Sequence, residues 1–327
     1  MKKCAAIMTI LTMLVIMICG CSSNSVKTSE KSKETITIAY QPCIGHVPFI
    51  VMKEQKLLER TYPGEIEVNW LEMKSGAAIN EGVVSGEIDA GAVGLAVAIA
   101  GIEAKGPYKI GFGLSAHPFL IMSRDDNIQS LTDIGKDTQI AIVNINSQPH
   151  ILLAKAAKAM LGDAHALDSN LTVLSNADGY SALISGAVDC HMVSSPYCFI
   201  EKDNHETLVH EIEIGSDIWP EENTAQVAIV SNKLHDEKPE VYNALVSAAQ
   251  EAMNYIDEHP METAKMLSTT YDADVADIQE WVTDDRTKFD IKLHGVMDMV
   301  RFMVDEGFLE DGPSSFSGMA YEEVEGD

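Results

Sequence analysis

The residues best suited to hold a small molecule lie in short polar loops between predicted strands and helices. The first is Gln41–His46, which separates the β-branched stretch 36–40 from an apolar pattern at helical spacing that starts at Val47. A strand, a tight turn and a helix make half of a βα unit. In open α/β sheets, ligands bind beyond the carboxyl ends of the strands, where helix N-termini offer unpaired N–H groups. Gln41–His46 is therefore a candidate binding loop.

Six more loops follow predicted strands and are rich in hydroxyl, amide or glycine residues. Such groups can hydrogen-bond a small molecule, although each loop could also serve only as a turn or a helix cap. The predicted ligand-binding residues are Gln41, Pro42, Ile44, His46, Lys74, Ser75, Gly76, Gly94, Leu95, Ser115, His117, Asn146, Ser147, Gln148, Asn176, Asp178, Ser195 and Tyr197.

Two classes of ligand suit these loops. Lys74 is the only lysine or arginine in them, and with helix N-terminal N–H groups at Gly76 and Gln148 it could hold a sulfonate or nitrate anion. The lack of arginine weakens that interpretation, because bidentate recognition of planar anions favours arginine. A neutral heterocycle such as a pyrimidine would suit the amides, the hydroxyls and the ring of Tyr197. Both classes remain open, and the residue types slightly favour the heterocycle.

Histidines and cysteines could carry other chemistry. His46, His117 and His150 each fall in a candidate loop, and three converging imidazoles could bind a metal ion or respond to pH. They share no short ligand spacing, so we expect no metal site and no cofactor. Cys190 and Cys198 could form a disulfide, but small buried thiols are the simpler prediction.

Recognisable catalytic motifs are missing from the sequence. It contains no G-x-S-x-G, H-E-x-x-H or P-loop pattern, each of which would place a nucleophile, a metal or a nucleotide phosphate. The segment 189–199, DCHMVSSPYCF, has two cysteines and a histidine but no cysteine-rich cluster. We therefore expect a binding protein without catalytic residues, not an enzyme.

Two similar α/β halves are predicted to carry the loops. Segments 66–97 and 171–197 each show a strand, a turn, a short helix ending in Ser-Gly, an aspartate and a further strand. Their SG-x-x-D runs, Ser85–Asp89 and Ser185–Asp189, lie 100 positions apart. We expect each glycine to end its helix at positive φ and each aspartate to cap or turn the chain, not to bind ligand.

The last third of the chain is predicted to be helical. Helical periodicity covers about 238–257, 260–269, 274–283 and 291–307. The last of these segments has a stripe of methionine and valine, which we expect to pack into the core. The terminal run 321–327, YEEVEGD, is predicted to be a solvated tail.

The N-terminus has the features of an exported lipoprotein. Lys2 and Lys3 precede a short apolar run that ends in Ile18-Cys19-Gly20-Cys21. A basic start, an apolar core too short to span a bilayer and small residues before a cleavage point are typical of an export signal. We expect residues 1–20 to be the signal peptide, Cys21 to be lipidated, and 21–34 to form a flexible tether. The formal net charge of −27 argues against nucleic acid as a partner.

The order of these motifs resembles a family of transport proteins. The segment 36–59, the segment 69–94 with its Ser85–Gly91 run, the break at 130–136 and the strand-and-helix stretch 139–161 are similar to the periplasmic solute-binding proteins of ABC importers. The resemblance is greatest to the nitrate/sulfonate/taurine-binding branch, which includes binders of thiamine pyrimidine precursors. It covers about residues 35–250.

This resemblance implies a fold and a set of partners. The fold would be the two-lobed, type II periplasmic binding protein fold of the α/β class, with mixed sheets flanked by helices and hinge segments near 119–124 and 226–231. Lobe 1 would comprise 35–122 and 231–327, and lobe 2 would comprise 123–230. The chain would be a monomer, anchored by lipid on the extracytoplasmic face, that captures a solute and delivers it to a permease with its ATPase.

The resemblance also gives weight to particular residues and leaves two alternatives. Gln41, Ser75, Ser115, Asn146 and Ser147 occupy the positions that the family associates with ligand contact. One alternative is a receptor that senses a solute without transporting it. The other is an enzyme similar to the thiamine-pyrimidine synthase of the same fold, which is less favoured because its cysteine-rich iron motif is missing from 189–199.

Overall fold

The computed structural model describes residues 33–205, 207–214, 218–271 and 273–327. The predicted signal peptide, the lipidation site at Cys21 and the tether up to residue 32 lie outside these residues. Within the described ranges, no helix is both long enough and apolar enough to cross a membrane. Residues 33–327 form one compact unit.

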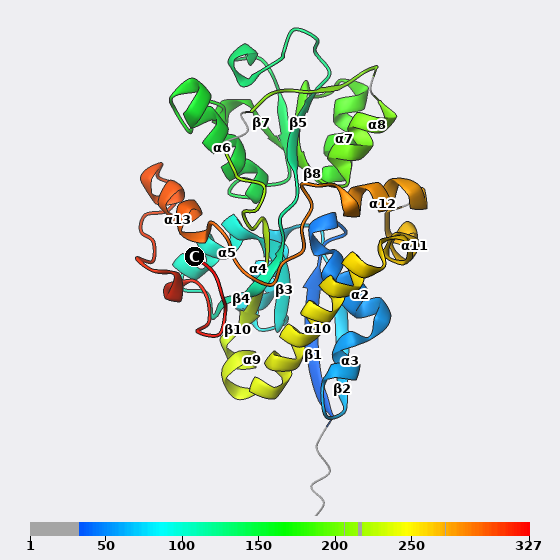
Figure 1. The fold of residues 1–327 in the computed structure, drawn as a ribbon. Helices are drawn as coiled ribbons and strands as arrows, with labels where there is room; N and C mark the ends of the chain where they lie inside the picture. Colours follow the sequence, from blue (N-terminus) through cyan, green and yellow to red (C-terminus); the bar gives the residue numbers. More distant parts are fainter. Residues whose placement is uncertain (1–32, 206, 215–217, 272) are drawn as a thin grey trace, which may run out of the picture. The chain divides into compact units, whose positions relative to one another are not determined.

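Two mixed five-stranded sheets organise this unit (Figure 1). The first has the order β2-β1-β3-β10-β4 and the second has the order β7-β6-β8-β5-β9. In the first sheet β1 runs parallel to β2 and β3, and β10 runs antiparallel between β3 and β4. In the second, β6 runs parallel to β7 and β8, and β5 runs antiparallel to β8 and pairs with β9. The strands are β1 (Glu34–Tyr40), β2 (Ile66–Glu72), β3 (Ala90–Gly94), β4 (Tyr108–Ser115), β5 (Phe119–Ser123), β6 (Ile140–Ile142), β7 (Leu171–Val173), β8 (Cys190–Ser194), β9 (His210–Glu211) and β10 (Gln226–Ser231).

Helices flank both sheets, which confirms the predicted α/β class with two sheet-based halves. The α-helices are α2 (Val47–Gln55), α3 (Leu57–Thr61), α4 (Gly76–Ser85), α5 (Leu95–Glu103), α6 (Gln148–Leu161), α7 (Asn176–Ser185), α8 (Tyr197–Asn204), α9 (Asn232–Glu237), α10 (Pro239–Glu258), α11 (Pro260–Tyr271), α12 (Val275–Thr283) and α13 (Val296–Asp305). Short 3-10 turns lie at Ile44–His46, Leu131–Asp133, Asp168–Asn170 and Phe316–Gly318. The helix α10 packs against α2 and α3, and α13 packs against α5.

Strand β1 shows why the first sheet needs helices on both faces. Its residues Ile36, Ile38 and Tyr40 belong to the apolar cluster that contains buried residues of α2 and α10. Ala39 belongs to the second cluster, which contains buried residues of α5 and α13. Because alternate side chains of a strand point to opposite faces, a strand buried on both faces must be almost continuously apolar. The segment 36–40 meets this requirement.

The repeated SG-x-x-D runs hold the central strands in register. Gly86 and Gly186 end α4 and α7 in the left-handed conformation, with φ of 80° and 79°. Asp89 Oδ2 accepts the Thr37 N–H at 2.8 Å, and Asp189 Oδ2 accepts the Gln139 N–H at 2.8 Å. Each aspartate thus ties the approach to one strand to its parallel neighbour. The predicted helix ends at the two glycines are confirmed, whereas each aspartate bonds a neighbouring segment instead of capping or turning its own.

The chain passes between the sheets next to β5 and β10. All of β5 pairs within the second sheet and all of β10 pairs within the first. Sheet membership therefore puts the two crossings at 116–118 and between Glu211 and Gln226, whereas the predicted lobe boundaries fall after residues 122 and 230. The division into two lobes stays a proposal, and we now place the boundaries between the lobes at these two crossings.

The C-terminal region matches the helical prediction and only part of the predicted tail. The methionines Met299 and Met303 of α13 are buried, as expected. The solvated tail is right only in part. Glu322, Glu323 and residues 325–327 are exposed, but Tyr321 is buried and its hydroxyl donates to the Val230 carbonyl at 2.9 Å. Ala320 bridges to Ile110 of β4, so the terminal segment covers what would otherwise be an exposed sheet edge.

Candidate ligand-binding site

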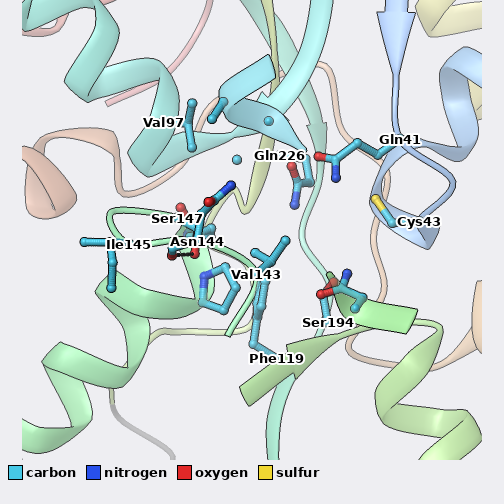
Figure 2. Close-up of a pocket in the computed structure, with 16 residues that line it drawn as sticks. Gln41, Cys43, Val97, Phe119, Val143, Asn144, Ile145, Ser147, Ser194 and Gln226 are labelled. Carbon is cyan, nitrogen blue, oxygen red and sulfur yellow. Dashed lines mark hydrogen bonds between the residues drawn. The ribbon is translucent and has the colours of Figure 1, made fainter. Parts of the chain in front are cut away.

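Strand ends of both sheets enclose a cavity of about 70 Å³ (Figure 2). The first sheet and its helices contribute Gln41 after β1, Gly76 at the start of α4, Gly94 at the end of β3, and Gln226 at the start of β10. The second contributes Asn144 after β6, Ser147 and Gln148 at the start of α6, Asn176 at the start of α7, and Ser194 at the end of β8. The cavity therefore occupies the place at which α/β folds bind ligands.

Three helix N-termini point their backbone N–H groups toward this cavity. In each case a serine caps the helix: Ser75 Oγ accepts the Ala78 N–H, Ser147 Oγ accepts the His150 N–H, and Ser175 Oγ accepts the Asp178 N–H. The cap satisfies the third N–H of the helix, while the N–H groups before it have no intrahelical partner. In α6 the second residue is Pro149, which has no N–H, so only the Gln148 N–H remains there. The first residues of α4, α6 and α7 line the cavity, so the walls are rich in hydrogen-bond donors.

The remaining lining is apolar and neutral. Val97, Phe119, Val143, Ile145 and Pro149 belong to this part, and in Figure 2 Phe119 and Val143 are drawn below Gln226. Ile145 is 53% exposed, so it lies at the rim. None of the side chains that line the cavity in the described part of the chain is charged.

Lys74, the predicted cation of the site, does not line the cavity. Its side chain is exposed, and its backbone carbonyl accepts the Gln41 Nε2 hydrogen at 3.2 Å. Gln41 Oε1 is thereby left as the acceptor end of that amide, turned toward Gly76. In this structure the positive potential at the cavity comes from helix N-termini and not from a basic side chain.

His46 lies behind the cavity wall and makes two hydrogen bonds. It is fully buried, its Nδ1 is 2.9 Å from the Gln41 backbone N, and its Nε2 is 3.0 Å from Gln226 Oε1. Burial lowers the pKa of His46 to about 4, so the ring is neutral at neutral pH. Both ring nitrogens have protein partners, and His46 acts on the cavity through Gln226.

The second buried amide, Gln148, joins the two halves. Its Oε1 accepts the Ala96 N–H of α5 at 2.8 Å, while the residue itself starts α6. Gln148 is 2% exposed, and its Nε2 has no hydrogen-bond partner among the residues that the structure describes. An unpaired buried amide is costly, about 1–3 kcal/mol. The Gln148 Nε2 is thus a buried donor available to a bound molecule.

Ser115 and His117 pack against the loop Gln41–His46. Ser115 Oγ donates to the Gly45 carbonyl at 3.0 Å and lies 3.2 Å from His117 Nδ1. Burial and the nearby His46 ring lower the pKa of His117 to about 3. Neither residue lines the cavity. A Cβ at Gly45 would lie 2.4 Å from His117 Cε1 and 2.6 Å from Gln226 Cγ, so the glycine allows this close packing.

The three predicted histidines do not converge. His150 lies apart from the other two, with Nδ1 3.0 Å from the Asn146 N and Nε2 3.8 Å from Asp168 Oδ1. Across the described ranges, no group of three or more His, Cys, Asp or Glu side chains could hold a metal ion. Cys190 and Cys198 are buried free thiols in this structure, as the simpler prediction had it.

Six of the predicted ligand-binding residues line the cavity, namely Gln41, Gly76, Gly94, Ser147, Gln148 and Asn176. The others support or surround it: Ser75 caps α4, Leu95 is buried in α5, Asp178 completes the cap of α7, and Asn146 is exposed with φ of 59°. Pro42 is half-buried, Ile44 and Ser195 are fully buried, and Tyr197 packs near Tyr180. Ligand contact by any of these residues stays a prediction.

Several lining residues were not among the predicted ones. Asn144 lies two residues before the predicted loop 146–150, and Ser194 begins the predicted loop 194–197 but was not itself selected. Phe119 begins β5 and contributes an aromatic ring to the lining. Gln226 had one signal in the sequence, a polar residue at the start of an apolar strand. Cys43 lines the cavity as a buried thiol, and burial raises its pKa to about 12, so it stays protonated.

Comparisons with known proteins support the resemblance found in the sequence. A protein of Escherichia coli (strain K12) named for the binding of aliphatic sulfonates is 27% identical over 173 residues, which cover 52% of this chain and 52% of that protein. The matched part thus spans about half the length of this curated relative. The crystal structure of the periplasmic aliphatic sulphonate binding protein SsuA from Escherichia coli matches with a TM-score of 0.69 at 18% identity, over 90% of this chain and 94% of that one.

The periplasmic nitrate-binding protein NrtA from Synechocystis PCC 6803 matches with a TM-score of 0.66 at 15% identity, over 88% of this chain and 84% of that one. At these identities the likeness shows the fold, which is that of the periplasmic binding proteins. A family model described as the NMT1-like family matches residues 29–270. Because that match covers most of the sequence, this chain belongs to the NMT1-like family.

Proposed function

We propose that this chain is the extracytoplasmic solute-binding component of an ABC importer and that its ligand is a small organic anion of the sulfonate type. The observation that carries the anion is the meeting of three helix N-termini at a cavity lined only by neutral side chains within the described residues. The relatives named for sulfonate and nitrate support the same class of ligand.

Helix N-termini can hold an anion without a cationic side chain. Each carries roughly half a positive elementary charge, and its first N–H groups point at the ligand. Gly76 and Ala77 of α4, Gln148 of α6 and Asn176 of α7 stand at these positions. A buried cation would meet the same positive ends and would be repelled. The positive sign of the electrostatic potential at the site therefore follows from the backbone.

The apolar side of the cavity suits the carbon part of such a ligand. Val97, Phe119, Val143 and the exposed Ile145 lie together there, so a short alkyl chain can pack against them while its head group meets the N–H groups. A pyrimidine-like heterocycle is the second candidate, because the flat ring of Phe119 and several neutral amides line the same cavity.

Capture would proceed by closure of the two halves around the solute. The halves are joined across the cavity by the bond from Ala96 N–H to Gln148 Oε1 and by Ile44 N–H to the Ser195 carbonyl at 3.4 Å. A ligand that touches both walls binds the closed form more tightly and so shifts the population toward it. The closed form would then dock on the permease, which works with its ATPase.

Anchoring and assembly complete the proposal. A lipidated Cys21 would hold the chain at the outer face of the cell membrane, since two or more acyl chains give stable anchoring where one does not. We propose a monomer that acts as a binding protein and has no catalytic residues. An uptake measurement distinguishes this function from that of a receptor that senses the same solute without a permease. For an importer component, loss of the chain should abolish import of the ligand into cells.

A ligand screen by thermal shift tests the proposal. Ethanesulfonate, taurine, nitrate and an aminopyrimidine are added to the chain in turn, and a ligand present at about 100 times its Kd should stabilise the fold by about 2.7 kcal/mol. Asn144→Asp adds a negative charge at the cavity and should abolish the response to anions. Asn243→Asp, on the exposed surface of α10, is the matched control. A response to the aminopyrimidine alone would replace the anion with the heterocycle.

A further inference from the structure

The tautomer of His46 follows from its partners. A backbone N–H can only donate, so the Gln41 N–H, 2.9 Å from His46 Nδ1, requires a lone pair on that nitrogen. A neutral imidazole then carries its proton on Nε2, and this N–H donates to Gln226 Oε1 at 3.0 Å. Because the Gln226 carbonyl is taken by His46, its amide nitrogen is the end left to face the cavity. Figure 2 shows the Gln226 side chain pointing into it.

The side-chain amide of Gln148 has the same orientation as that of Gln226, with its nitrogen toward the cavity, for an independent reason. The Ala96 N–H can only donate and meets Gln148 Oε1 at 2.8 Å, so the carbonyl oxygen of this amide is taken as well. Its Nε2 is buried and has no partner in the part of the chain that the structure describes. Two buried glutamines, one from each half, thus turn N–H donors toward the same cavity.

We propose that His46 is a positioning residue which, by fixing the orientation of Gln226, makes the buried end of the cavity select head groups that only accept hydrogen bonds. A fully ionised sulfonate satisfies both amides. A head group of equal charge that carries a proton, such as a monoanionic phosphonate, has only two oxygens that solely accept. Once these meet the two amides, its O–H is left to face the N–H donors of the helix N-termini at the same cavity. This inference rests on the proposed anion-binding function and names the feature that decides between anions.

The surroundings of His46 keep this orientation in place. Gly45 lets His117 and Gln226 pack within contact of the loop, and no carboxylate lines the cavity among the described residues. If His46 lost its Nε2 proton donor, the Gln226 amide could turn over and present its carbonyl. A sulfonate would then lose a donor, and a protonated phosphonate would gain an acceptor.

The test compares two anions of equal charge on three forms of the full chain. Ethanesulfonate and ethylphosphonate, which keeps one P–OH at about pH 6, are titrated by calorimetry. We expect the unchanged chain to prefer the sulfonate by about tenfold or more, which is what one unpaired buried donor costs. His46→Phe keeps the bulk of the ring and should reduce this preference by about tenfold. His46→Gln keeps a donor for Gln226 Oε1 and should restore it.

A spectroscopic readout keeps the inference testable if a variant does not fold. In the unchanged chain labelled with ¹⁵N-histidine, His46 should show a protonated Nε2 and an unprotonated Nδ1. A proton on Nδ1, or an unaltered preference in folded His46→Phe, would overturn the inference while leaving the anion site intact. If neither anion binds the folded, unchanged chain, both the proposed anion-binding function and this inference are wrong.

Discussion

At the scale of single residues, the neutral histidines behind the cavity connect binding to stability. His46 and His117 lie side by side, and burial lowers the pKa of His46 to about 4 and that of His117 to about 3. Their hydrogen-bond partners, the Gln41 N–H, Gln226 and Ser115, are uncharged. The His46 ring is the charge that adds to burial in lowering the pKa of His117, and Glu211, Glu213 and Arg286 line a second pocket with His117. The fold holds both in the neutral form.

Stability is therefore expected to fall as the pH drops below about 6.5. Above that pH neither the folded nor the unfolded chain protonates these rings, and their full contribution is present. Below it, and down to about pH 4, these histidines are protonated in the unfolded chain but not in the folded chain. The free energy of unfolding therefore falls by about 1.4 kcal/mol per pH unit for each histidine. Urea unfolding at about pH 7.5 and pH 5 should show that the free energy of unfolding falls by about 2 kcal/mol per histidine. In His46→Gln the fall should be smaller by the contribution of that one histidine. A free energy of unfolding that is flat over this range would contradict the assignment.

Gly45 permits the contact between the loop and these residues. An alanine there would place its Cβ 2.4 Å from His117 Cε1 and 2.6 Å from Gln226 Cγ, so both side chains would have to move. We expect Gly45→Ala to cost about 1–3 kcal/mol of stability and to weaken ligand binding, measured by chemical denaturation and calorimetry. Gly135→Ala is the matched control, since its Cβ would approach nothing nearer than Thr138 Oγ1 at 3.9 Å. Equal behaviour of the two variants would show that the loop tolerates the added methyl group.

At the scale of elements, the sequence was most informative where local chemistry decides the structure. The strand-loop-helix order around Gln41–His46 and the two SG-x-x-D runs were predicted, because apolar periodicity, glycine at positive φ and short polar caps act within a few residues. The pairing of β10 between β3 and β4 was not, since it depends on contacts far apart in sequence. For the same reason Gln226, which lines the cavity, was not predicted, and Lys74, which was predicted, does not line it. Whether a loop residue faces the cavity depends on the opposite half.

The serine caps offer a test of the helix N-termini. Ser147 Oγ accepts the His150 N–H and donates to the Asn144 carbonyl at 2.6 Å, so it fixes the first turn of α6 at the cavity. Ser147→Ala should cost about 1 kcal/mol of stability and weaken anion binding several-fold. Ser247→Ala, in an exposed position within α10, should change neither by a comparable amount. Anion affinity that is unaffected by the loss of the cap would remove α6 from the site.

At the scale of the whole molecule, both halves are needed to complete the cavity. Residues from both sheets line it, and the chain crosses between them beside β5 and β10, whose first residues, Phe119 and Gln226, are themselves lining residues. Any change in the angle between the halves therefore alters the site directly. Binding and closure are expected to be one equilibrium, in which the ligand and the contacts between the halves favour the same state.

Gln148 is the residue at which this coupling can be measured. In the closed arrangement its Oε1 satisfies the Ala96 N–H; in an open one, water can do so. Gln148→Met keeps the volume but removes the amide. The closed form alone then loses the bond between the halves and is left with an unsatisfied buried N–H at Ala96, at a cost of about 1–3 kcal/mol that removal of the unpaired Gln148 Nε2 offsets in part. That penalty shifts the ligand-free population toward the open form and raises the apparent Kd by about tenfold or more.

Small-angle scattering should find the ligand-free Gln148→Met variant more expanded than the unchanged chain, and saturating ethanesulfonate should bring the two to the same size. Gln250→Met, on the exposed face of α10, controls for the loss of a glutamine. If the Gln148 variant were as compact as the unchanged chain but bound more weakly, Gln148 would serve the ligand alone. If it were expanded with unaltered affinity, the contact with Ala96 would set the angle between the halves without being coupled to capture. Only both effects together would make Gln148 the link between the ligand and closure.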